Sequence, residues 1–310
     1  MITTVNLNPC IDKSVMVSGF KYGELNRVIS TRIDVSGKAI NVGIAIKKLG
    51  ADVECLGFNY SENGKELEKT LQNYGISYEF VTVNGKLRTN TKILDMETRI
   101  LTELNESGGK VTDRDIQNLK EVVKHHGAKS TTVVIGGSVP VGVGKNIYRE
   151  LIEELSSYPA KIILDAEKDL LLEGVKARPY LIKPNLYELQ TAFGKDCNTK
   201  EEVYEVAKGI IKKGVSLVCV SLGKEGAILC SGEEAYFSPG LELDIRGVQG
   251  AGDSMVAGIC IAIERGLPMR ELLRYGMAAS AGSLVLEGTQ MCGKEHFETY
   301  LQQIKVERMG

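Results

Sequence analysis

The sequence predicts an α/β fold, a three-layer sandwich in which helices cover both faces of a mostly parallel central sheet. Short apolar runs of strand length alternate along the chain with helical patterns, which is typical of parallel strands joined by crossover helices. The runs are apolar throughout, as expected for strands buried on both faces. Apolar and polar residues instead alternate over 30–36, 90–95 and 99–105, which predicts a small antiparallel sheet with one solvated face.

The individual elements follow from local patterns. Strands are expected at 2–8, 53–58, 131–137, 161–166, 180–185 and 216–223. Helices are expected at 39–50, 62–75, 112–127, 199–214, 253–265 and 268–287. Gly50 and Gly75 end the first two helices, Thr112 is an N-cap candidate, and Thr199 with Glu202 forms a capping-box pattern. We expect one domain over 1–310.

The small sheet is interpreted as a lid whose strands lie roughly within 13–35 and 88–105, with a turn at 95–98. Lids exclude water from reactive sites. A simple edge hairpin is the alternative interpretation, because the alternating pattern alone does not separate the two.

Composition and charge exclude several classes of protein. The formal net charge is −2, so neither a nucleic-acid binder nor a membrane-surface binder is indicated. No apolar run reaches the length of a membrane span, and the first residues lack the pattern of a signal peptide. The seven cysteines are scattered without a C-x-x-C pair, which favours free thiols in a reducing cytoplasm over a metal or disulfide framework.

Histidine is scarce in this chain. Of the three histidines, His125 and His126 end a predicted helix, where cations suit the helix dipole, and we interpret both as surface residues. General acid–base chemistry is therefore expected from aspartate, glutamate or lysine.

The stretch V-Q-G-A-G-D-S-M-V-A-G at 248–258 places an acid directly after small residues. A dinucleotide fingerprint requires a third glycine where Met255 stands, and no segment fits the P-loop pattern. The remaining interpretation is a helix N-terminus whose exposed amides bind an anion. Asp253 as a plain helix-start acid is the alternative from this stretch alone.

Six segments together resemble the ribokinase-like (PfkB) carbohydrate kinases, in that family's order. They are N-P-C-I-D, S-G-K-A-I-N-V, G-G-S-V-P, K-P-N-L-Y-E-L, S-L-G-K-E-G-A and G-A-G-D-S-M-V-A-G. The resemblance runs from about residue 2 to beyond residue 290. The segments L-R-T-N-T-K and T-E-L-N-E-S-G, with the N-L-N-P opening, are most similar to the phosphosugar branch of that family.

This resemblance implies a ribokinase-like fold and ATP-dependent phosphorylation of a ketohexose phosphate. Fructose 1-phosphate, converted to the 1,6-bisphosphate, is the first expectation. Tagatose 6-phosphate, fructose 6-phosphate or an unphosphorylated sugar are the alternatives. A catalytically silent sugar- or nucleotide-binding protein is a further alternative, and the missing third glycine opposes a nicotinamide-dependent oxidoreductase.

The resemblance also assigns the catalytic groups. Asp253 matches the position of the base that accepts the proton of the sugar hydroxyl. We expect the helix start to keep this carboxylate ionised and therefore weakly basic. The amides of Gly250, Ala251 and Gly252 would stabilise the charge on the transferred group.

Residues of three segments are implied in binding the acceptor. Asp12 would accept hydrogen bonds from sugar hydroxyls, and Ser138 could donate to the substrate. Arg27 is a further candidate for the phosphate. The remaining candidates are Gly37, Lys38 and Asn41 in the substrate loop, and Arg88, Asn90 and Lys92, which share one face of a strand.

For the nucleotide, Asn185 and Glu188 form the family's N-x-x-E. They are implied to organise Mg²⁺ through water rather than to ligate it directly. Ser221, Gly223 and Gly226 resemble the loop beside the ATP phosphates and ribose. A homodimer through the lid sheet is also expected from the resemblance.

Two departures from the family pattern bear on the substrate. Ser36 and Ala39 flank Gly37-Lys38 where glycine is usual, so a methyl group is added where backbone often approaches substrate. Gln249 stands before the glycine-rich turn where a smaller or β-branched residue is common.

Overall fold

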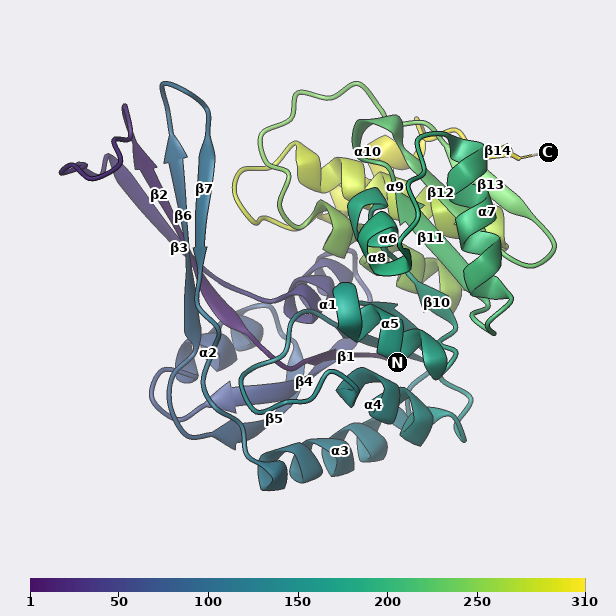
Figure 1. Ribbon diagram of the computed structural model, residues 1–310, viewed down its shortest axis with the longest axis horizontal. Coiled ribbons are helices and arrows are strands. Elements are labelled where there is room, and N and C mark those ends of the chain that lie inside the picture. Colours follow the sequence, from purple (N-terminus) through teal and green to yellow (C-terminus); the bar gives the residue numbers. More distant parts are fainter. Residues whose placement is uncertain (310) are drawn as a thin grey trace.

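A ten-stranded sheet forms the centre of the molecule in a computed structural model that describes residues 1–309 (Figure 1). In spatial order its strands are β14 (Glu307–Arg308), β13 (Ala235–Ser238), β12 (Ala227–Cys230), β11 (Leu217–Ser221), β10 (Leu181–Ile182), β9 (Lys161–Asp165), β8 (Thr132–Gly136), β1 (Ile2–Asn6), β4 (Val53–Tyr60) and β5 (Ser77–Val83). The strands from β11 to β5 are parallel, and β12, β13 and β14 continue the sheet antiparallel. The predicted, mostly parallel sheet is confirmed.

Helices cover both faces of this sheet. One layer contains α1 (Lys38–Lys48), α2 (Lys65–Asn73), α8 (Ala251–Glu264), α9 (Met269–Leu284) and α10 (Lys294–Leu301). The other contains α3 (Asp113–Gly127), α4 (Ile147–Leu155), α5 (Lys168–Lys176), α6 (Leu186–Phe193) and α7 (Lys200–Ile211). The short 3-10 helix η1 (Gly223–Glu225) follows β11. Every residue of β1 and β8 is buried, so the unbroken apolar runs reflect helices on both sides.

Capping residues begin two of the predicted helices as expected. Thr112 caps α3 by accepting from the amide of Asp115, and Thr199 caps α7 by accepting from the amide of Glu202. In both cases the carboxylate of the acid accepts a hydrogen bond from the cap amide, which completes a capping box.

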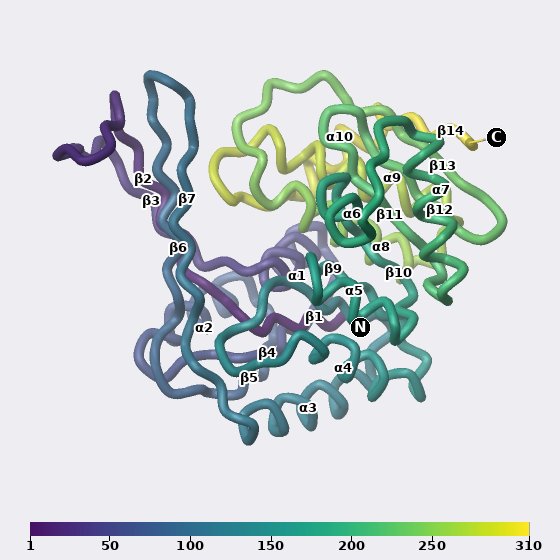
Figure 2. Tube along the Cα trace, viewed as in Figure 1, coloured from purple at the N-terminus to yellow at the C-terminus, as the bar shows by residue number. Residues whose placement is uncertain are grey.

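The small sheet that the sequence predicts as a lid is a separate four-stranded sheet that projects from the rest of the molecule (Figure 2), and it is called the lid below. Its strands, in spatial order, are β3 (Ser30–Ser36), β2 (Cys10–Val17), β6 (Arg88–Asp95) and β7 (Leu101–Asn105). The outer pairs are antiparallel, but β2 and β6 are parallel. The sequence predicted an antiparallel sheet throughout. The central pair differs because the chain passes through the large domain between β2 and β6, instead of turning directly.

One histidine is not the plain surface residue that the sequence predicted. His126 lies between two carboxylates, with Nδ1 2.8 Å from Glu54 Oε2 and Nε2 2.9 Å from Glu79 Oε2. It therefore ties the end of α3 to β4 and β5, whereas His125 is exposed.

All seven cysteines are buried and unpaired. Across residues 1–309, every helix is too short or too polar to cross a membrane.

Candidate active site

A cavity of about 410 Å³ lies between the carboxyl ends of the parallel strands and the lid. Ligands of open α/β sheets bind at this edge. The cavity brings together most of the site residues that the sequence predicted, from segments far apart along the chain. They are Asp12, Gly37, Lys38, Asn41, Arg88, Asn90, Lys92, Asn185, Glu188, Ser221, Gly250, Gly252 and Asp253.

Helix α8 begins at the cavity with a left-handed turn. Its N-cap, Gly250, has φ 76°, a region where a side chain is strained. A Cβ there would also lie 2.2 Å from Cε of Met291. No side chain caps this helix, and the first amides of a helix have no acceptor within it. The backbone of Ala251 and Gly252 therefore offers free donors where the helix dipole is positive.

The Asp253 side chain is buried, with 8% of its surface exposed, yet it lines the cavity. Asn41 Nδ2 donates to its Oδ2 at 2.8 Å. Burial raises the pKa of Asp253 to about 6, and the charge of Asp165 adds to this, while Lys38, Asn41 and Lys183 oppose it. At neutral pH this carboxylate is still mostly ionised, as expected, but it is more basic than its helix-start position predicted, because desolvation outweighs the helix dipole. A carboxylate with a pKa near 6 is better matched to accepting a proton near neutral pH.

Two buried residues that the sequence did not predict, Asp165 and Lys183, form an ion-pair cluster with Lys38. Lys38 Nζ lies 3.1 Å from Asp165 Oδ1, and Lys183 Nζ lies 3.5 Å from the same oxygen. Both Asp165 and Lys183 are nearly inaccessible. Asp165 ends β9 and Lys183 follows β10. Polar residues at the carboxyl ends of predicted strands were therefore the signal that could have identified them.

These charges hold one another in place. Burial opposes the charge of Lys38, but Asp165, Glu188 and Asp253 raise its pKa above the ordinary value. Burial likewise disfavours the charge of Asp165, yet Lys183 and Lys38 bring its pKa below the ordinary value. Lys38 is therefore held as a cation, and Asp165 lies between it and Lys183.

The lid contributes a second polar cluster. Lys92 Nζ donates to Asp12 Oδ2 at 2.9 Å, and Asn90 Nδ2 donates to Asp12 Oδ1 at 3.1 Å. The carboxylate of Asp12 is thus fixed in the cavity wall by two side chains of β6. Cys10 lies beside it, and burial raises the pKa of that thiol to about 12, which makes Cys10 a packing residue.

Arg88 is a cation without a carboxylate partner in the chain over residues 1–309. Its guanidinium donates to the carbonyl oxygens of Glu106 at 3.2 Å and Asn8 at 3.3 Å. Its Nε is buried and makes no hydrogen bond. Since Lys92 is paired with Asp12, Arg88 is the lid-side cation of the cavity that has no ion-pair partner within residues 1–309.

Asn185 and Glu188 begin α6 as a capping box. Asn185 Oδ1 accepts from the Glu188 amide at 2.8 Å, and Glu188 Oε2 accepts from the Asn185 amide at 2.9 Å. The second carboxylate oxygen, Oε1, lies 3.7 Å from Lys38 Nζ. The N-x-x-E pattern therefore also has a structural role, and it leaves oxygen atoms on the cavity.

Three residues predicted for the acceptor or the transferred group do not line this cavity. Arg27 lies on the exposed loop between β2 and β3, because that loop extends beyond the lid strands. The hydroxyl of Ser138 accepts a hydrogen bond from Asn8 Nδ2 at 3.2 Å. Ala251 packs its methyl group into the protein interior, so only its backbone remains a candidate.

Two glycines predicted for the nucleotide also lie outside the cavity. A Cβ at Gly226 would lie 1.9 Å from the carbonyl oxygen of Ser238. Gly226 is therefore needed for the close approach of two backbone segments. Gly223 begins η1 with φ 60°. Ala39 is fully buried and also does not line the cavity, so its methyl group does not narrow it.

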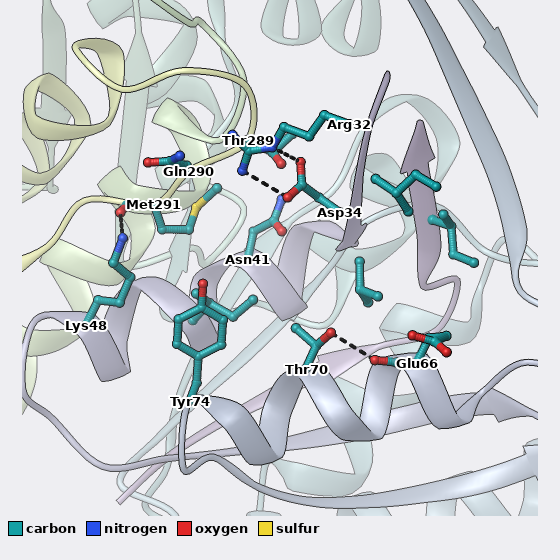
Figure 3. Close-up of a pocket in the computed structure, with 14 residues that line it drawn as sticks. Arg32, Asp34, Asn41, Lys48, Glu66, Thr70, Tyr74, Thr289, Gln290 and Met291 are labelled. Carbon is teal, nitrogen blue, oxygen red and sulfur yellow. Dashed lines mark hydrogen bonds and ion pairs between the residues drawn. The ribbon is translucent and has the colours of Figure 1, made fainter. Parts of the chain in front are cut away.

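A larger cavity of about 590 Å³ lies behind Asn41, between β3, α1, α2 and residues 289–291 (Figure 3). In the wall of this cavity, the guanidinium of Arg32 donates two hydrogen bonds to the carboxylate of Asp34, at 2.7 and 2.9 Å. Lys48 donates to the carbonyl oxygen of Met291. Asp253 does not line it, so we assign the reaction to the smaller cavity.

Known proteins are similar to this chain in sequence. A family model described as pfkB family carbohydrate kinase matches residues 5–296. The protein of Bacillus subtilis named 1-phosphofructokinase is 31% identical over 309 residues, covering 100% of each chain. The one of Rhodobacter capsulatus is 32% identical over 309 residues, 99% of this chain and 98% of its own.

Two solved structures extend the likeness to the fold. A possible 1-phosphofructokinase from Thermotoga maritima matches with a TM-score of 0.90 at 28% identity, covering 100% of each chain. A ribokinase from the same organism matches with a TM-score of 0.80 at 19% identity, covering 97% of this chain and 99% of its own. The predicted ribokinase-like fold is confirmed.

Proposed function

Because the chain belongs to the pfkB family of carbohydrate kinases, we propose that this ATP-dependent sugar kinase uses fructose 1-phosphate as its acceptor and forms fructose 1,6-bisphosphate. One observation carries the proposal. A single cavity holds a buried carboxylate, an uncapped helix N-terminus and an arginine that no carboxylate neutralises. The relatives from Bacillus subtilis and Rhodobacter capsulatus, which match over 100% and 98% of their own length, are named for this activity.

Asp253 acts as the general base. It takes the proton of the free primary hydroxyl of the sugar as that oxygen forms a bond to the γ-phosphorus. The bond between the γ-phosphorus and the bridging oxygen of ATP breaks, and ADP leaves. Asn41 keeps the Asp253 carboxylate oriented through the 2.8 Å hydrogen bond, so the base does not have to be positioned during the reaction.

Charge on the transferred group is stabilised by donors that are already in place. The amides that begin α8 are free of protein acceptors within the helix. Lys38 and Lys183 are held beside them by Asp165. Phosphoryl transfer requires mainly positioning and electrostatic stabilisation, and this arrangement supplies both without reorganisation.

Asn185 and Glu188 suit a magnesium ion with its water shell. Mg²⁺ prefers oxygen ligands and usually keeps several waters. Glu188 and Asn185 line the cavity, and Lys38 is the cation next to Glu188 Oε1, at 3.7 Å. When bound, Mg²⁺ would neutralise phosphate charge on ATP.

Arg88 and Asp12 account for an acceptor that carries a phosphate and hydroxyl groups. The guanidinium of Arg88 can bind a phosphate with two parallel hydrogen bonds. Asp12, fixed by Lys92 and Asn90, can accept hydrogen bonds from sugar hydroxyls.

Coupled measurement of ADP release with Mg-ATP tests the proposal directly. The acceptors are fructose 1-phosphate, fructose 6-phosphate, tagatose 6-phosphate and fructose, and ³¹P NMR identifies the product. We expect the highest kcat/KM with fructose 1-phosphate. A higher value for tagatose 6-phosphate would replace the proposed acceptor, and no turnover with any of them would refute the assignment.

The lid is also the proposed site of homodimer formation. Its outer face carries Ile33 and Leu104, which are 64% and 58% exposed, in one row across the sheet. Ile29 and Ile100 are exposed near the lid tip. Apolar area of this kind marks an interaction surface. The seven unpaired thiols suit a protein that works in the reducing cytoplasm.

A further inference from the structure

Gln249 connects the lid to the loop that begins α8. Lys92 Nζ of β6 donates to its Oε1 at 2.9 Å, and its Nε2 donates to Glu103 Oε1 of β7 at 3.4 Å. Gln249 directly precedes Gly250, the left-handed N-cap of α8. One side chain therefore spans the gap between two lid strands and the proposed phosphoryl-transfer site.

The chemistry of the partners fixes the orientation of this amide. Lysine can only donate, and an ionised carboxylate can only accept. The amide therefore has to present its oxygen to Lys92 and its nitrogen to Glu103. An aliphatic β-branched side chain at position 249, such as valine, has no polar group for either contact.

Lys92 extends the connection to the acceptor site. The same ammonium group that donates to Gln249 also donates to Asp12 Oδ2 at 2.9 Å. Asp12, Lys92, Glu103 and Gln249 all line the cavity. A displacement of the lid would break both contacts of Gln249 and carry the paired Lys92 and Asp12 away from the start of α8 together.

We propose that Gln249 is a positioning residue that latches the closed lid to the first turn of α8. It makes lid closure and the placement of Asp12 against the acceptor a single event. The inference rests on the proposed function, because the acceptor site it organises is the one assigned there.

A reciprocal exchange with Glu103 tests the latch. Gln249→Glu places two carboxylates side by side, which repel each other. Adding Glu103→Gln restores a donor opposite an acceptor, with Lys92 still able to pair with residue 249. Contacting groups of this kind are strongly non-additive. We expect Gln249→Glu to raise the KM for the sugar phosphate about tenfold, and the double variant to return to within roughly threefold of the wild type.

Gln249→Leu removes both hydrogen bonds at similar volume, and Gln290→Leu is the matched control. Gln290 lines the second cavity on the nearby loop (Figure 3), and within residues 1–309 its side chain makes no hydrogen bond to the lid, unlike that of Gln249. We expect Gln249→Leu to raise the KM for the sugar phosphate about tenfold with the KM for ATP within twofold. Gln290→Leu should change neither. Equal effects on both Michaelis constants, or additive effects in the exchange pair, would overturn the latch.

Hydrogen exchange separates this inference from the proposed function. Without any substrate, amides of β6 and β7 should exchange faster in Gln249→Leu than in the wild type or in Gln290→Leu. Unchanged exchange would refute the latch even if the wild type proved inactive. A wild type that is active while Gln249→Leu behaves normally would refute the latch and leave the proposed function intact.

Discussion

Replacing Asp253 with asparagine should increase stability and abolish most of the activity. The amide keeps the shape of the carboxylate and, in one orientation, still accepts from Asn41. It cannot take a proton, and general bases contribute about 10²- to 10⁴-fold to a rate. We therefore expect kcat of Asp253→Asn to fall by at least about 100-fold, with the affinity for ATP within threefold of the wild type.

The gain in stability follows from the raised pKa. Folding moves the pKa of Asp253 from its ordinary value of 3.8 to about 6, so the folded state holds this proton more tightly than the unfolded state. Ionisation of Asp253 therefore lowers the free energy of unfolding, and this stability is lost as the pH rises from about 4 to above 6. The full cost of the ionised carboxylate is about 3 kcal/mol at pH 8, and about 0.5 kcal/mol of it has accrued at pH 4.

Urea denaturation at pH 8 and pH 4 measures this cost. Asp253→Asn should be more stable than the wild type by up to about 3 kcal/mol at pH 8, and by about 0.5 kcal/mol at pH 4. The control is Asp244→Asn, whose side chain is 86% exposed and should stay within about 0.5 kcal/mol at both pH values. Equal stability of Asp253→Asn and the wild type at pH 8 would show that burial does not raise the pKa of Asp253. Undiminished kcat would show that Asp253 is not the base.

Four further outcomes are expected. With saturating Mg-ATP, kcat/KM for the sugar phosphate should fall below about pH 6 as Asp253 is protonated. Asn41→Ala should move the midpoint of this pH profile to higher pH, because the hydrogen bond from Asn41 lowers the pKa of Asp253. An unmoved midpoint would assign the titration to another group. Arg88→Ala should raise the KM for the sugar phosphate by roughly 10-fold or more and leave the KM for ATP within twofold, whereas equal changes would argue against a phosphate contact. Sedimentation velocity should give a dimer for the wild type and a monomer for Ile33→Asp/Leu104→Asp, and a monomeric wild type would rule the lid dimer out. EDTA should abolish turnover, with recovery on adding Mg²⁺ and an unchanged Tm; persistent turnover in EDTA would contradict a metal requirement.

The sequence predicted the central part of the fold well, because its strands are buried on both faces. An unbroken apolar run such as 132–136 has few other interpretations between two glycine-containing segments. Elements with weaker patterns were missed. The start of β2 lies before the predicted lid range of 13–35, because Asp12, Lys13 and Ser14 interrupt its apolar residues. The helices α4 and α5 are short and have no side-chain cap. Local signals of this size do not outweigh tertiary contacts.

The site was predicted where a motif places the residue itself at the reaction, as with Asp253 and Lys38. It was incomplete where three-dimensional packing decides the role. Asp165 and Lys183 are distant in sequence and meet only because β9 and β10 are adjacent in the sheet. The raised pKa of Asp253 depends on the same packing, so a helix-start position alone predicted the wrong direction.

The balance of charge in the cavity favours the proposed requirement for a divalent cation. On the nucleotide side, Lys38 and Lys183 are matched by Asp165 and Glu188, and ionised Asp253 leaves one excess negative charge. The protein's own charges therefore cannot neutralise a triphosphate. The N-termini of α1, α6 and α8 each contribute roughly half a positive charge at best. We therefore propose that the missing countercharge arrives with ATP as Mg²⁺. Asn185 and Glu188 already satisfy each other's backbone amides without a metal. The fold is therefore complete before the metal binds, which is why chelation should remove activity and leave Tm unchanged.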